Sequence, residues 1–328
     1  MSYLNRWGNP LDVSIIIVNW NTKDLLRNCI KSIYQQSGSV VYEVVVVDNA
    51  SSDGSVGMVR SEFPQVKVIV EKSNRGYAVA VNEGIVISTG RYVLVLNSDI
   101  LICDSAVEKT VHYADKNLAA AVIGCQVFDG RGVLSMSCFR FPSVLNVALD
   151  AFWLNKIFKN NRFFDRELIP EWTRDSEREV DVIEGMFMLV RRQAIDTVGL
   201  MDESYFFFFE ETDWCYRFAK AGWKMMFWPG AKIIHIHGGG QSQKKAGIRL
   251  AVQYTKNLLI FFRKHYSWAE YFLARVLLTF RSGCRCVLWG ILRLYRALII
   301  QDAQYERQKV QFYWWSFLYC VFGSEPSE

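Results

Sequence analysis

The sequence predicts an α/β protein with a mostly parallel, doubly wound sheet flanked by helices, followed by a helical, amphipathic C-terminal extension. In the first third of the chain, short runs of β-branched residues alternate with segments of helical spacing, as in repeated βα units. The apolar runs are continuous, which is typical of parallel strands buried on both faces. From about residue 246 the chain changes to long apolar and aromatic segments with scattered arginines, which indicates the extension.

Four strands and the helices between them are expected in the first hundred residues. The strands are Val13–Asn19, Glu43–Val47, Val66–Val70 and Arg91–Leu96. The helices are expected after Thr22, which is a suitable N-cap, and at 56–63 and 77–88. Ligands of such sheets bind beyond the carboxyl ends of the strands, so we expect a site formed by 19–21, 48–51 and 97–99.

The rest of the chain is less regular. A charged and aromatic stretch at 160–178 has no clear period and predicts a long loop. Val180–Val190 reads as a strand with Gly185 inside it. The later expected elements are a helix at 212–221 with Gly222 as its C-cap, short strands at 224–228 and 232–235, and helices at 254–266, 269–300 and 305–322.

The composition allows two lobes and excludes several classes of protein. Of the 328 residues, 51% are hydrophobic, which is enough for a sizeable core. The net charge of +5 is mild and there is no long Lys/Arg block, so no nucleic-acid partner is expected. Eight cysteines without a Cys-x-x-Cys pair argue against a zinc site or disulfide framework and suit a reducing, cytoplasmic location. Residues 1–11 lack the apolar region of a secretory signal.

A carboxylate closes the fourth expected strand, at Asn97-Ser98-Asp99. Asp99 can there bind Mg²⁺ or Mn²⁺ that bridges a diphosphate, or it can simply cap the next turn. Asp48 ends a neighbouring strand, and this second carboxylate favours a ligand site. His235 and His237 are further metal candidates, with packing or a surface position as the alternative. We expect one of the two to face the site.

Three polar features could bind a nucleotide. Asp48 begins a tight turn that runs to Gly54, and its carboxylate can accept a hydrogen bond from a base or a ribose; an ordinary surface turn is the alternative. The segment 73–76 precedes a helix, where exposed backbone N–H groups and Arg75 suit an anion. Asn82 lies among apolar residues of that helix, so it needs either a buried partner or a ligand.

Glu210, Glu211 and Asp213 form a cluster of carboxylates at the start of a helix. Four phenylalanines precede them and should reduce local solvation, and both burial and like charge raise the pKa of a carboxyl group. Such a group can take a proton from a hydroxyl. The alternatives are an acidic helix N-terminus that suits the helix dipole and, for Asp213, an ion pair with Arg217 four residues later.

These residues resemble the family-2 glycosyltransferases of GT-A fold, and among them the bacterial rhamnosyltransferase-like enzymes. The resemblance covers about residues 12–245. The segments that carry it are 14–21 (SIIIVNWN), 47–54 (VDNASSDG), 74–77 (NRGY), 96–99 (LNSD), 185–192 (GMFMLVRR), 199–203 (GLMDE) and 209–217 (FEETDWCYR), followed by Ala221-Gly222. Each segment alone is weak, but their order and spacing together are highly specific.

The resemblance implies a role for each of the acidic motifs. Asn97-Ser98-Asp99 stands where the family has its D-x-D motif, with Asn in place of the first acid, so Asp99 is the expected ligand of a divalent metal, Mg²⁺ or Mn²⁺. His237 is favoured to complete that site, and His235 is kept as the alternative. Glu211 is the expected catalytic base. The family more usually has Asp at this position, so Glu210 and Asp213 stay as alternatives.

The resemblance also places the substrates. Contacts to the nucleotide sugar are expected from Asn19, Asn21, Asp48, Ser51, Asn74, Arg75, Gly76, Asn82, Asn97 and Ser98. Glu184 and Gly185 are expected at the acceptor. In domain terms, residues 1–125 would be the nucleotide-sugar-binding half, 126–245 the acceptor-binding half with the base, and 246–328 the helical extension.

The implied activity is inverting transfer of a sugar from a nucleoside diphosphate, with dTDP-rhamnose as a candidate donor. The acceptor would be a hydroxyl of a saccharide or polyprenyl-linked saccharide, in the synthesis of a cell-surface polysaccharide such as lipopolysaccharide. A non-catalytic nucleotide-sugar or saccharide-binding protein of the same fold is the alternative. A dinucleotide-dependent oxidoreductase would need a glycine-rich turn after the first strand, and 19–23 contains no glycine.

The helical extension is expected at a membrane surface. Arg275, Arg281 and Arg285 disfavour a spanning helix, since each costs roughly 2.5–3.5 kcal/mol near the bilayer centre and about a dozen apolar residues at roughly −0.5 kcal/mol do not offset that. A basic amphipathic segment in the interface, with snorkelling arginines, fits better. We therefore expect a peripheral protein on the cytoplasmic face of the inner membrane, with a helical cap on the catalytic lobe as the alternative.

Overall fold

A computed structural model of the chain describes residues 11–36, 38–236, 241–299 and 304–323, and for residues 36 and 241–251 it describes the backbone alone. The chain forms two compact units. Unit 1 consists of Met1–Phe141, Trp172–Phe206 and Glu210–Gly240, as far as these are described, and unit 2 of Pro142–Glu171, Phe207–Phe209 and Gln241–Glu328. Most of the segment 1–245, for which two halves are predicted, thus lies in one unit.

Unit 1 is built on a mixed β-sheet. Its strands are β1 (Val13–Asn19), β2 (Tyr42–Asp48), β3 (Lys67–Val70), β4 (Tyr92–Asn97), β5 (Ile100–Cys103), β6 (Ala120–Asp129), β7 (Cys138–Phe139), β8 (Arg178–Val180), β9 (Val182–Ile183), β10 (Phe187–Arg191) and β11 (Lys224–His235). The order across the large sheet is β3-β2-β1-β4-β10-β6-β11-β5, with β8 beside β11, and β7 pairs with β9 separately. The four strands predicted for the first third all form.

The sheet is parallel where the βα units repeat and mixed beyond them. β3, β2, β1 and β4 run parallel to one another. β10 lies antiparallel between β4 and β6, and β11 runs parallel to β6 but antiparallel to β5 and β8. The insertion of β10 beside β4 brings the middle of the chain to the carboxyl end of the parallel strands, where a site is expected.

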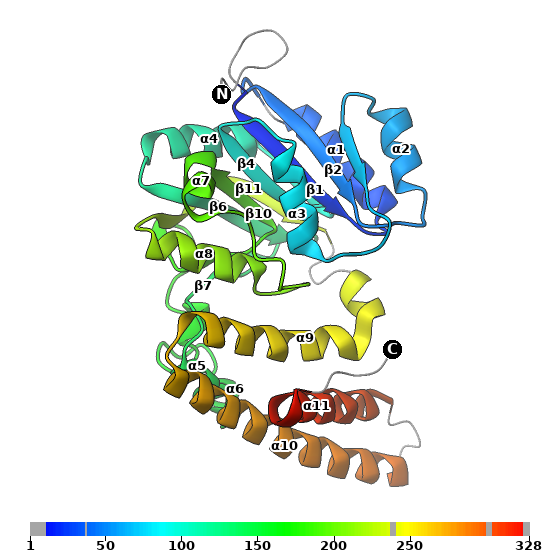
Figure 1. Cartoon of the computed structure of the whole chain (residues 1–328), viewed down its shortest axis with the longest axis vertical. Coiled ribbons are helices and arrows are strands. Elements are labelled where there is room, and N and C mark those ends of the chain that lie inside the picture. The colour runs from blue at the N-terminus through cyan, green and yellow to red at the C-terminus, as the bar shows by residue number, and fades with distance from the viewer. Residues whose placement is uncertain (1–10, 37, 237–240, 300–303, 324–328) are drawn as a thin grey trace. The chain divides into compact units, whose positions relative to one another are not determined.

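Helices cover both faces of this sheet (Figure 1). In unit 1 they are α1 (Lys23–Gln36), α2 (Ser55–Glu62), α3 (Tyr77–Val86), α4 (Ala106–Lys116), α7 (Arg192–Val198) and α8 (Glu210–Lys220). Ile15 and Ile17 belong to the core under α1, which includes Leu26. Ile16 points to the other face and meets α3, where a Cβ on Gly84 would come within 2.5 Å of its side chain. The strands are therefore buried on both sides, as the continuous apolar runs predict.

Two sequence predictions for the middle of the chain need correction. The single strand expected at Val180–Val190 is three short strands: the chain leaves the large sheet after β8, β9 pairs with β7, and the loop at 184–186 leads back into the large sheet at β10. The two strands expected at 224–228 and 232–235 are one strand, β11, whose pairing with β6 shifts between Phe227 and Lys232. The break at 184–186 matters for function because it places a loop, instead of a flat strand, near the strand ends.

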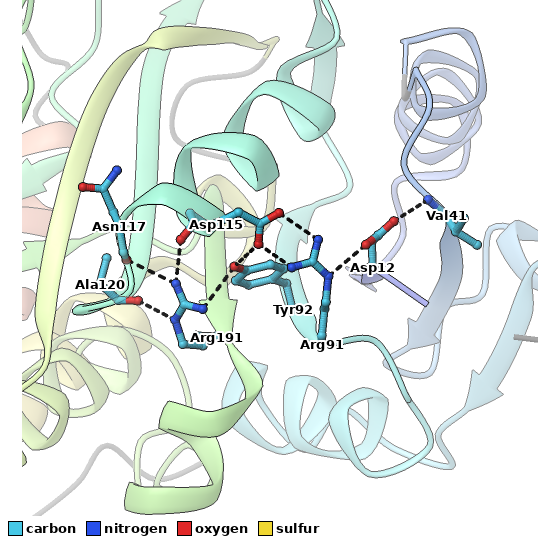
Figure 2. A network of polar contacts seen from close by, with 9 residues as sticks. Asp12, Val41, Arg91, Tyr92, Asp115, Asn117, Ala120 and Arg191 are labelled. Atoms are coloured by element: carbon cyan, nitrogen blue, oxygen red, sulfur yellow. Dashed lines mark hydrogen bonds and ion pairs between the residues drawn. The ribbon is translucent and has the colours of Figure 1, made fainter. Parts of the chain in front are cut away.

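A polar network fixes the amino ends of the central strands (Figure 2). Arg91 forms ion pairs with Asp12 and Asp115, and Tyr92 Oη donates to Asp115 Oδ1 at 2.8 Å. From β10, Arg191 donates to Tyr92 Oη at 3.1 Å and to the carbonyls of Ala114, Asn117 and Ala120. The charged groups at this edge thus satisfy one another and hold β10 beside β4.

Unit 2 is helical and contains the C-terminal extension. Its elements are α5 (Val144–Ala151), α6 (Leu154–Ile157), the 3₁₀ turn η1 (Arg166–Leu168), α9 (Gln241–His265), α10 (Trp268–Ile299) and α11 (Gln304–Phe322). The turn η1 lies within the long loop predicted at 160–178. Among the described residues, no helix has the length and apolar content needed to cross a membrane.

The arginines of α10 do not all behave as predicted. Arg281 and Arg285 are buried and pair with Asp150 Oδ2 and Oδ1 at 2.8 and 3.0 Å. Arg275 donates to the Cys320 carbonyl at 2.6 Å. These three side chains hold the helices of unit 2 together. The prediction of snorkelling toward lipid is wrong for the buried Arg281 and Arg285, whereas Arg275 is partly exposed. A partner in α5, more than a hundred residues away, explains why the sequence pattern of α10 alone was misleading.

Candidate active site

Asn19 and Asp48 end β1 and β2 side by side, because the register of these strands pairs them. The Asn19 amide donates to Asp48 Oδ2 at 2.7 Å and to Ser51 Oγ at 3.1 Å. Asp48 Oδ1 accepts the Ser51 N–H at 2.8 Å. Asp48 is buried, and both of its oxygens accept hydrogen bonds from the protein. It shapes the turn at 48–51, and a contact with a nucleoside stays a prediction.

Hydroxyl groups join the end of β4 to the end of β1. Thr22 Oγ1 donates to Asn19 Oδ1 at 2.7 Å, which leaves Ser98 Oγ, also 2.7 Å away, to donate to Thr22. The N–H of Asn21 donates to Ser51 Oγ at 2.8 Å. The three strand ends predicted to form the site are therefore one connected polar edge.

The loop before α3 does not offer the free backbone N–H groups expected for an anion. The N–H of Arg75 donates to Asn49 Oδ1, and that of Gly76 to Asn74 Oδ1, both at 3.0 Å. The N–H of Tyr77 donates to another backbone carbonyl at 2.8 Å. Gly76 has φ of 96°, and a Cβ there would come within 2.5 Å of that carbonyl, so the loop requires glycine. These three N–H groups are hydrogen-bonded within the protein, and an anion site at this helix N-terminus stays a prediction.

The Arg75 guanidinium is exposed and lies 2.6 Å from Glu83 Oε1 and 3.4 Å from Glu71 Oε2. Two carboxylates thus already share its charge. A role for this side chain at a phosphate stays a prediction, and it would require Arg75 to exchange partners.

Asn82 has a buried protein partner, which was one of the two predicted explanations. Its Nδ2 donates to the Met201 carbonyl at 2.9 Å and to Glu203 Oε1 at 3.1 Å, and its Oδ1 accepts the Met201 N–H at 3.0 Å. Both polar atoms of the Asn82 amide are therefore hydrogen-bonded within the protein, and the side chain connects α3 to the loop at 201–203. A ligand is not needed to explain a polar residue at this buried position.

Asp99 and His235 come together at the edge of the sheet. β11 runs antiparallel to β5 in a register that places His235 opposite Ile100, and the N–H of Ile236 donates to the Asp99 carbonyl at 3.0 Å. His235 Nε2 lies 3.0 Å from Asp99 Oδ2, and both side chains are largely buried. The histidine predicted as the alternative metal ligand therefore faces Asp99. His237 lies outside the described residues.

Asp99 and His235 suit a divalent cation in chemistry and in number. A carboxylate oxygen and an imidazole nitrogen converge within hydrogen-bond distance of each other, and both are ligands that Mn²⁺ accepts. In the described part of the chain, no group of three or more His, Cys, Asp or Glu side chains could hold a metal ion. Such a short protein ligand set matches the way Mg²⁺ sites use one or two carboxylates together with substrate phosphates.

Glu184, Glu210 and Glu211 form a group of three carboxyls with separated pKa values. Burial and the charge of Glu211 raise the pKa of Glu210 well above its ordinary value. The same two causes raise the pKa of Glu184 to about 8. Burial also raises the pKa of Glu211, but a hydrogen bond from the Gly185 N–H opposes that shift. Of the three, Glu211 is the one whose pKa the Gly185 N–H lowers against the effect of burial.

The geometry of Glu211 suits a base. Among the described residues its Oε2 is buried without a hydrogen-bond partner, as is Oε2 of Glu210. Glu210 is buried, whereas Glu211 is only partly so. Asp213 differs from both, because it pairs with Arg217 Nε at 2.8 Å and accepts from Tyr205 Oη at 3.4 Å. Of the predicted alternatives for Asp213, the ion pair with Arg217 is the one that the structure supports.

Tyr77 joins the two halves of the site and was not predicted as a site residue. Its hydroxyl lies 3.1 Å from Asn97 Oδ1 and 3.1 Å from the Gly185 carbonyl, and it can donate to only one of them at a time. The charges of Glu211, Glu210 and Asp99 all raise its pKa, after burial. The carboxylate pair on α8 and the carboxylate that follows β4 therefore surround one side chain. An aromatic residue at the start of a helix gives no sequence signal for this, since its two partners lie 20 and 108 residues away.

Comparison with known proteins finds similarity to glycosyltransferases. A model described as glycosyl transferase family 2 matches residues 14–171. The chain is 26% identical to the N-acetylglucosaminyl-diphospho-decaprenol L-rhamnosyltransferase of Mycobacterium tuberculosis. This alignment of 276 residues covers 79% of this chain and 84% of that protein. The chain is also 30% identical to the succinoglycan biosynthesis protein ExoO of Rhizobium meliloti. This alignment of 158 residues covers 47% of this chain and 45% of that protein.

A solved structure has the same fold. The mannosyltransferase PcManGT of Pyrobaculum calidifontis, in complex with GDP-Man and Mn²⁺, superposes with a TM-score of 0.56 at 17% identity, covering 95% of this chain and 88% of that one. The fold is thus of the GT-A type that the sequence predicts. The chain carries a glycosyltransferase family 2 domain and, over most of its length, resembles a rhamnosyltransferase.

Proposed function

We propose that the protein is an inverting, metal-dependent glycosyltransferase that moves a sugar, with rhamnose as the first candidate, from a nucleoside diphosphate to a lipid-linked saccharide. The observation that carries this proposal is the convergence around Tyr77. The Tyr77 hydroxyl connects the end of β4 with the loop at Gly185, the charges of Glu211 and Asp99 both act on it, and Asp99 pairs with His235. Transfer needs a base at the acceptor and charge neutralisation at the leaving group, and the site has groups suited to each.

In the proposed reaction Glu211 removes the proton of the acceptor hydroxyl. The hydroxyl oxygen forms a bond to the anomeric carbon of the donor sugar while the bond from that carbon to the diphosphate oxygen breaks. The electron pair of that bond leaves with the nucleoside diphosphate, and the anomeric configuration inverts. A divalent cation held by Asp99 and His235 would neutralise charge on the departing diphosphate.

The neighbouring residues prepare this step. Glu184 and Glu210 are neutral near pH 7 because their pKa values are raised, so they add no charge that would repel an ionised Glu211. Gly185 donates its N–H to Glu211 and therefore fixes the direction in which the carboxylate points. With no Cβ, Gly185 also leaves room beside the Tyr77 hydroxyl, which a Cβ would approach to 3.1 Å.

The identity of the relative supports the choice of substrates. The M. tuberculosis enzyme is named for L-rhamnosyl transfer to N-acetylglucosaminyl-diphospho-decaprenol, and the alignment covers 79% of this chain. We therefore propose dTDP-rhamnose as the donor, a polyprenyl-diphosphate saccharide as the acceptor, and a peripheral position at the cytoplasmic face of the membrane that holds this acceptor. Synthesis of a cell-surface polysaccharide is the process that such a product would serve.

The test is a donor and acceptor screen on the purified full-length protein. Nucleoside diphosphate release is measured with dTDP-rhamnose and with UDP- and GDP-sugars, with and without an N-acetylglucosaminyl-diphospho-lipid. We expect acceptor-dependent release with one donor, loss of release in excess chelator, and a product whose anomeric configuration by NMR is opposite to that of the donor. Donor binding without transfer or hydrolysis would instead support the non-catalytic binding protein.

A further inference from the structure

One side of α10 presents a long apolar surface to solvent. At 100° per residue, a sector of about 140° contains no charged side chain along the helix. Its exposed large members are Phe272, Leu273, Val276, Phe280, Val287, Ile291, Leu294, Tyr295 and Leu298. With a rise of about 1.5 Å per residue, a helix of this length extends for roughly 45 Å. We call these nine residues the apolar face of α10.

The charged residues of α10 lie on its other sides and most are used within unit 2. Arg281 and Arg285 are buried with Asp150, and the Arg285 guanidinium also lies 4.9 Å from the centre of the Trp153 ring. Arg296 pairs with Glu306 of α11 at 3.0 Å. The helix is therefore anchored to unit 2 through its polar sides, and this anchoring leaves the apolar face outward. An apolar patch of this size on a soluble surface marks an interaction site.

The charge of this part of the chain favours a lipid surface over a second copy of the protein. Residues 241–328 contain 13 lysines and arginines against five aspartates and glutamates, whereas the whole chain contains 38 and 33. A symmetric dimer through α10 would bring two such basic segments together. A leaflet with anionic lipids would attract the same charge, with each basic residue near the surface contributing. Exposed Trp268 and Tyr295 are also residue types that accumulate at the membrane–water boundary.

We propose that α10 lies in the plane of a membrane leaflet that contains anionic lipids, with its apolar face inserted at the boundary between headgroups and acyl chains. An in-plane helix needs an apolar side and a polar side, and α10 has both without the uninterrupted apolar length of a spanning helix. Only the biological purpose of this membrane contact rests on the proposed function, since an enzyme that uses a lipid-linked acceptor gains by residing at the surface that holds this acceptor. It replaces the predicted role of arginine snorkelling with insertion of aliphatic and aromatic side chains.

Vesicle flotation of the full-length protein tests this proposal without any substrate. The test variant is the double substitution Val287→Glu and Ile291→Glu, at face positions that are 64% and 59% exposed. The matched control is Val86→Glu and Leu118→Glu, two apolar residues of unit 1 that are each 71% exposed. Vesicles are made of phosphatidylcholine alone or of equal parts phosphatidylcholine and phosphatidylglycerol. Circular dichroism and thermal unfolding establish that each variant is folded.

We expect the unaltered protein and the control to float with the anionic vesicles and to bind the neutral vesicles more weakly. The face variant should lose at least roughly tenfold in binding, because two carboxylates cannot enter the acyl-chain boundary without a large penalty. Equal binding by the face variant and the control would overturn the proposal. The proposal would also be overturned if the unaltered protein did not bind vesicles and formed a dimer in light scattering, while the face variant was a monomer.

The outcome is separable from that of the proposed function. Transfer to a water-soluble acceptor should proceed equally in the face variant and the unaltered protein, because α10 belongs to unit 2 and the proposed catalytic groups belong to unit 1. Vesicle binding by a protein with no transferase activity would overturn the function and keep the membrane face. Transfer without vesicle binding would overturn the membrane face and keep the function.

Discussion

Replacing Glu211 by Gln should remove most of the turnover, whereas the same change at Glu210 should be mild. Glu210 holds its proton at neutral pH, because burial and the charge of Glu211 raise its pKa well above the ordinary value. Gln has the shape of a protonated Glu, so Glu210→Gln exchanges one neutral group for another. Glu211→Gln instead removes the carboxyl group that we propose accepts the proton of the acceptor hydroxyl.

The two changes should differ by orders of magnitude in kcat. General base catalysis contributes about 10²–10⁴-fold, which is about 2.7–5.4 kcal/mol of activation free energy at 1.36 kcal/mol per tenfold. At Glu210 the loss should not exceed about one neutral hydrogen bond, roughly 0.5–1.5 kcal/mol or up to about tenfold. Even that is an upper bound, since Oε2 of Glu210 has no hydrogen-bond partner among the described residues.

Single-turnover and steady-state rates of nucleoside diphosphate release measure this difference, with donor affinity determined separately by calorimetry. Donor affinity should change little in either variant, because a base acts only in the chemical step. Asp213→Asn is a useful third variant. It breaks the buried pair with Arg217, so it should lower the melting temperature more than either Glu variant does. A crippling Glu210→Gln together with a mild Glu211→Gln would refute the assignment of the base.

Three further outcomes are expected. Asp99→Ala should lower kcat roughly a hundredfold or more and abolish stimulation by Mn²⁺, since Lewis-acid catalysis contributes several kcal/mol; unchanged rates in excess chelator would contradict this. Tyr77→Phe should lower kcat by about fivefold to thirtyfold, or about 1–2 kcal/mol, with a smaller effect on donor KM, because the hydroxyl orients groups that act in the reaction; equal losses in kcat and melting temperature across buffers would indicate a purely structural role. The pKa of Glu184 is raised from 4.5 to about 8, so the folded state binds more protons than the unfolded chain in that interval and unfolding free energy should fall as pH rises through it; calorimetry should show a flatter dependence in Glu184→Gln, and an unchanged slope would count against the shift.

The parts of the fold that depend on local sequence could be predicted. β1 matches the apolar run at 13–19, and the strand ends at Asn19, Asp48 and Asn97 meet because parallel strands of similar length bring their carboxyl ends to one edge. The acidic cluster at the start of α8 could also be recognised, since it needed only the residue types and their position before a helix. In each case neighbours in sequence determine the feature.

The parts that depend on pairing between distant segments could not be predicted. The break at 184–186 follows from β10 entering the sheet antiparallel between β4 and β6. The residue types of this segment do not indicate that pairing. The contact between His235 and Asp99 depends on the register of β11 against β5. The buried state of Arg281 and Arg285 depends on Asp150, whose distance in sequence no helical pattern reveals.

The different environments of Glu210 and Glu211 show how the fold distinguishes two residues that are equivalent in the sequence pattern. Adjacent residues on a helix point about 100° apart, so the first turn of α8 directs one carboxyl into the core and the next toward the loop at 184–186. Burial raises the pKa of both carboxyls, that of Glu210 well above its ordinary value, and only Glu211 gains the Gly185 N–H, which lowers its pKa. A shift of α8 by one residue would exchange these environments and with them the base. The loop at Gly185 therefore contributes as much to the identity of the base as the acidic cluster does, and Tyr77, which touches that loop, is the side chain through which the strand end at Asn97 can influence it.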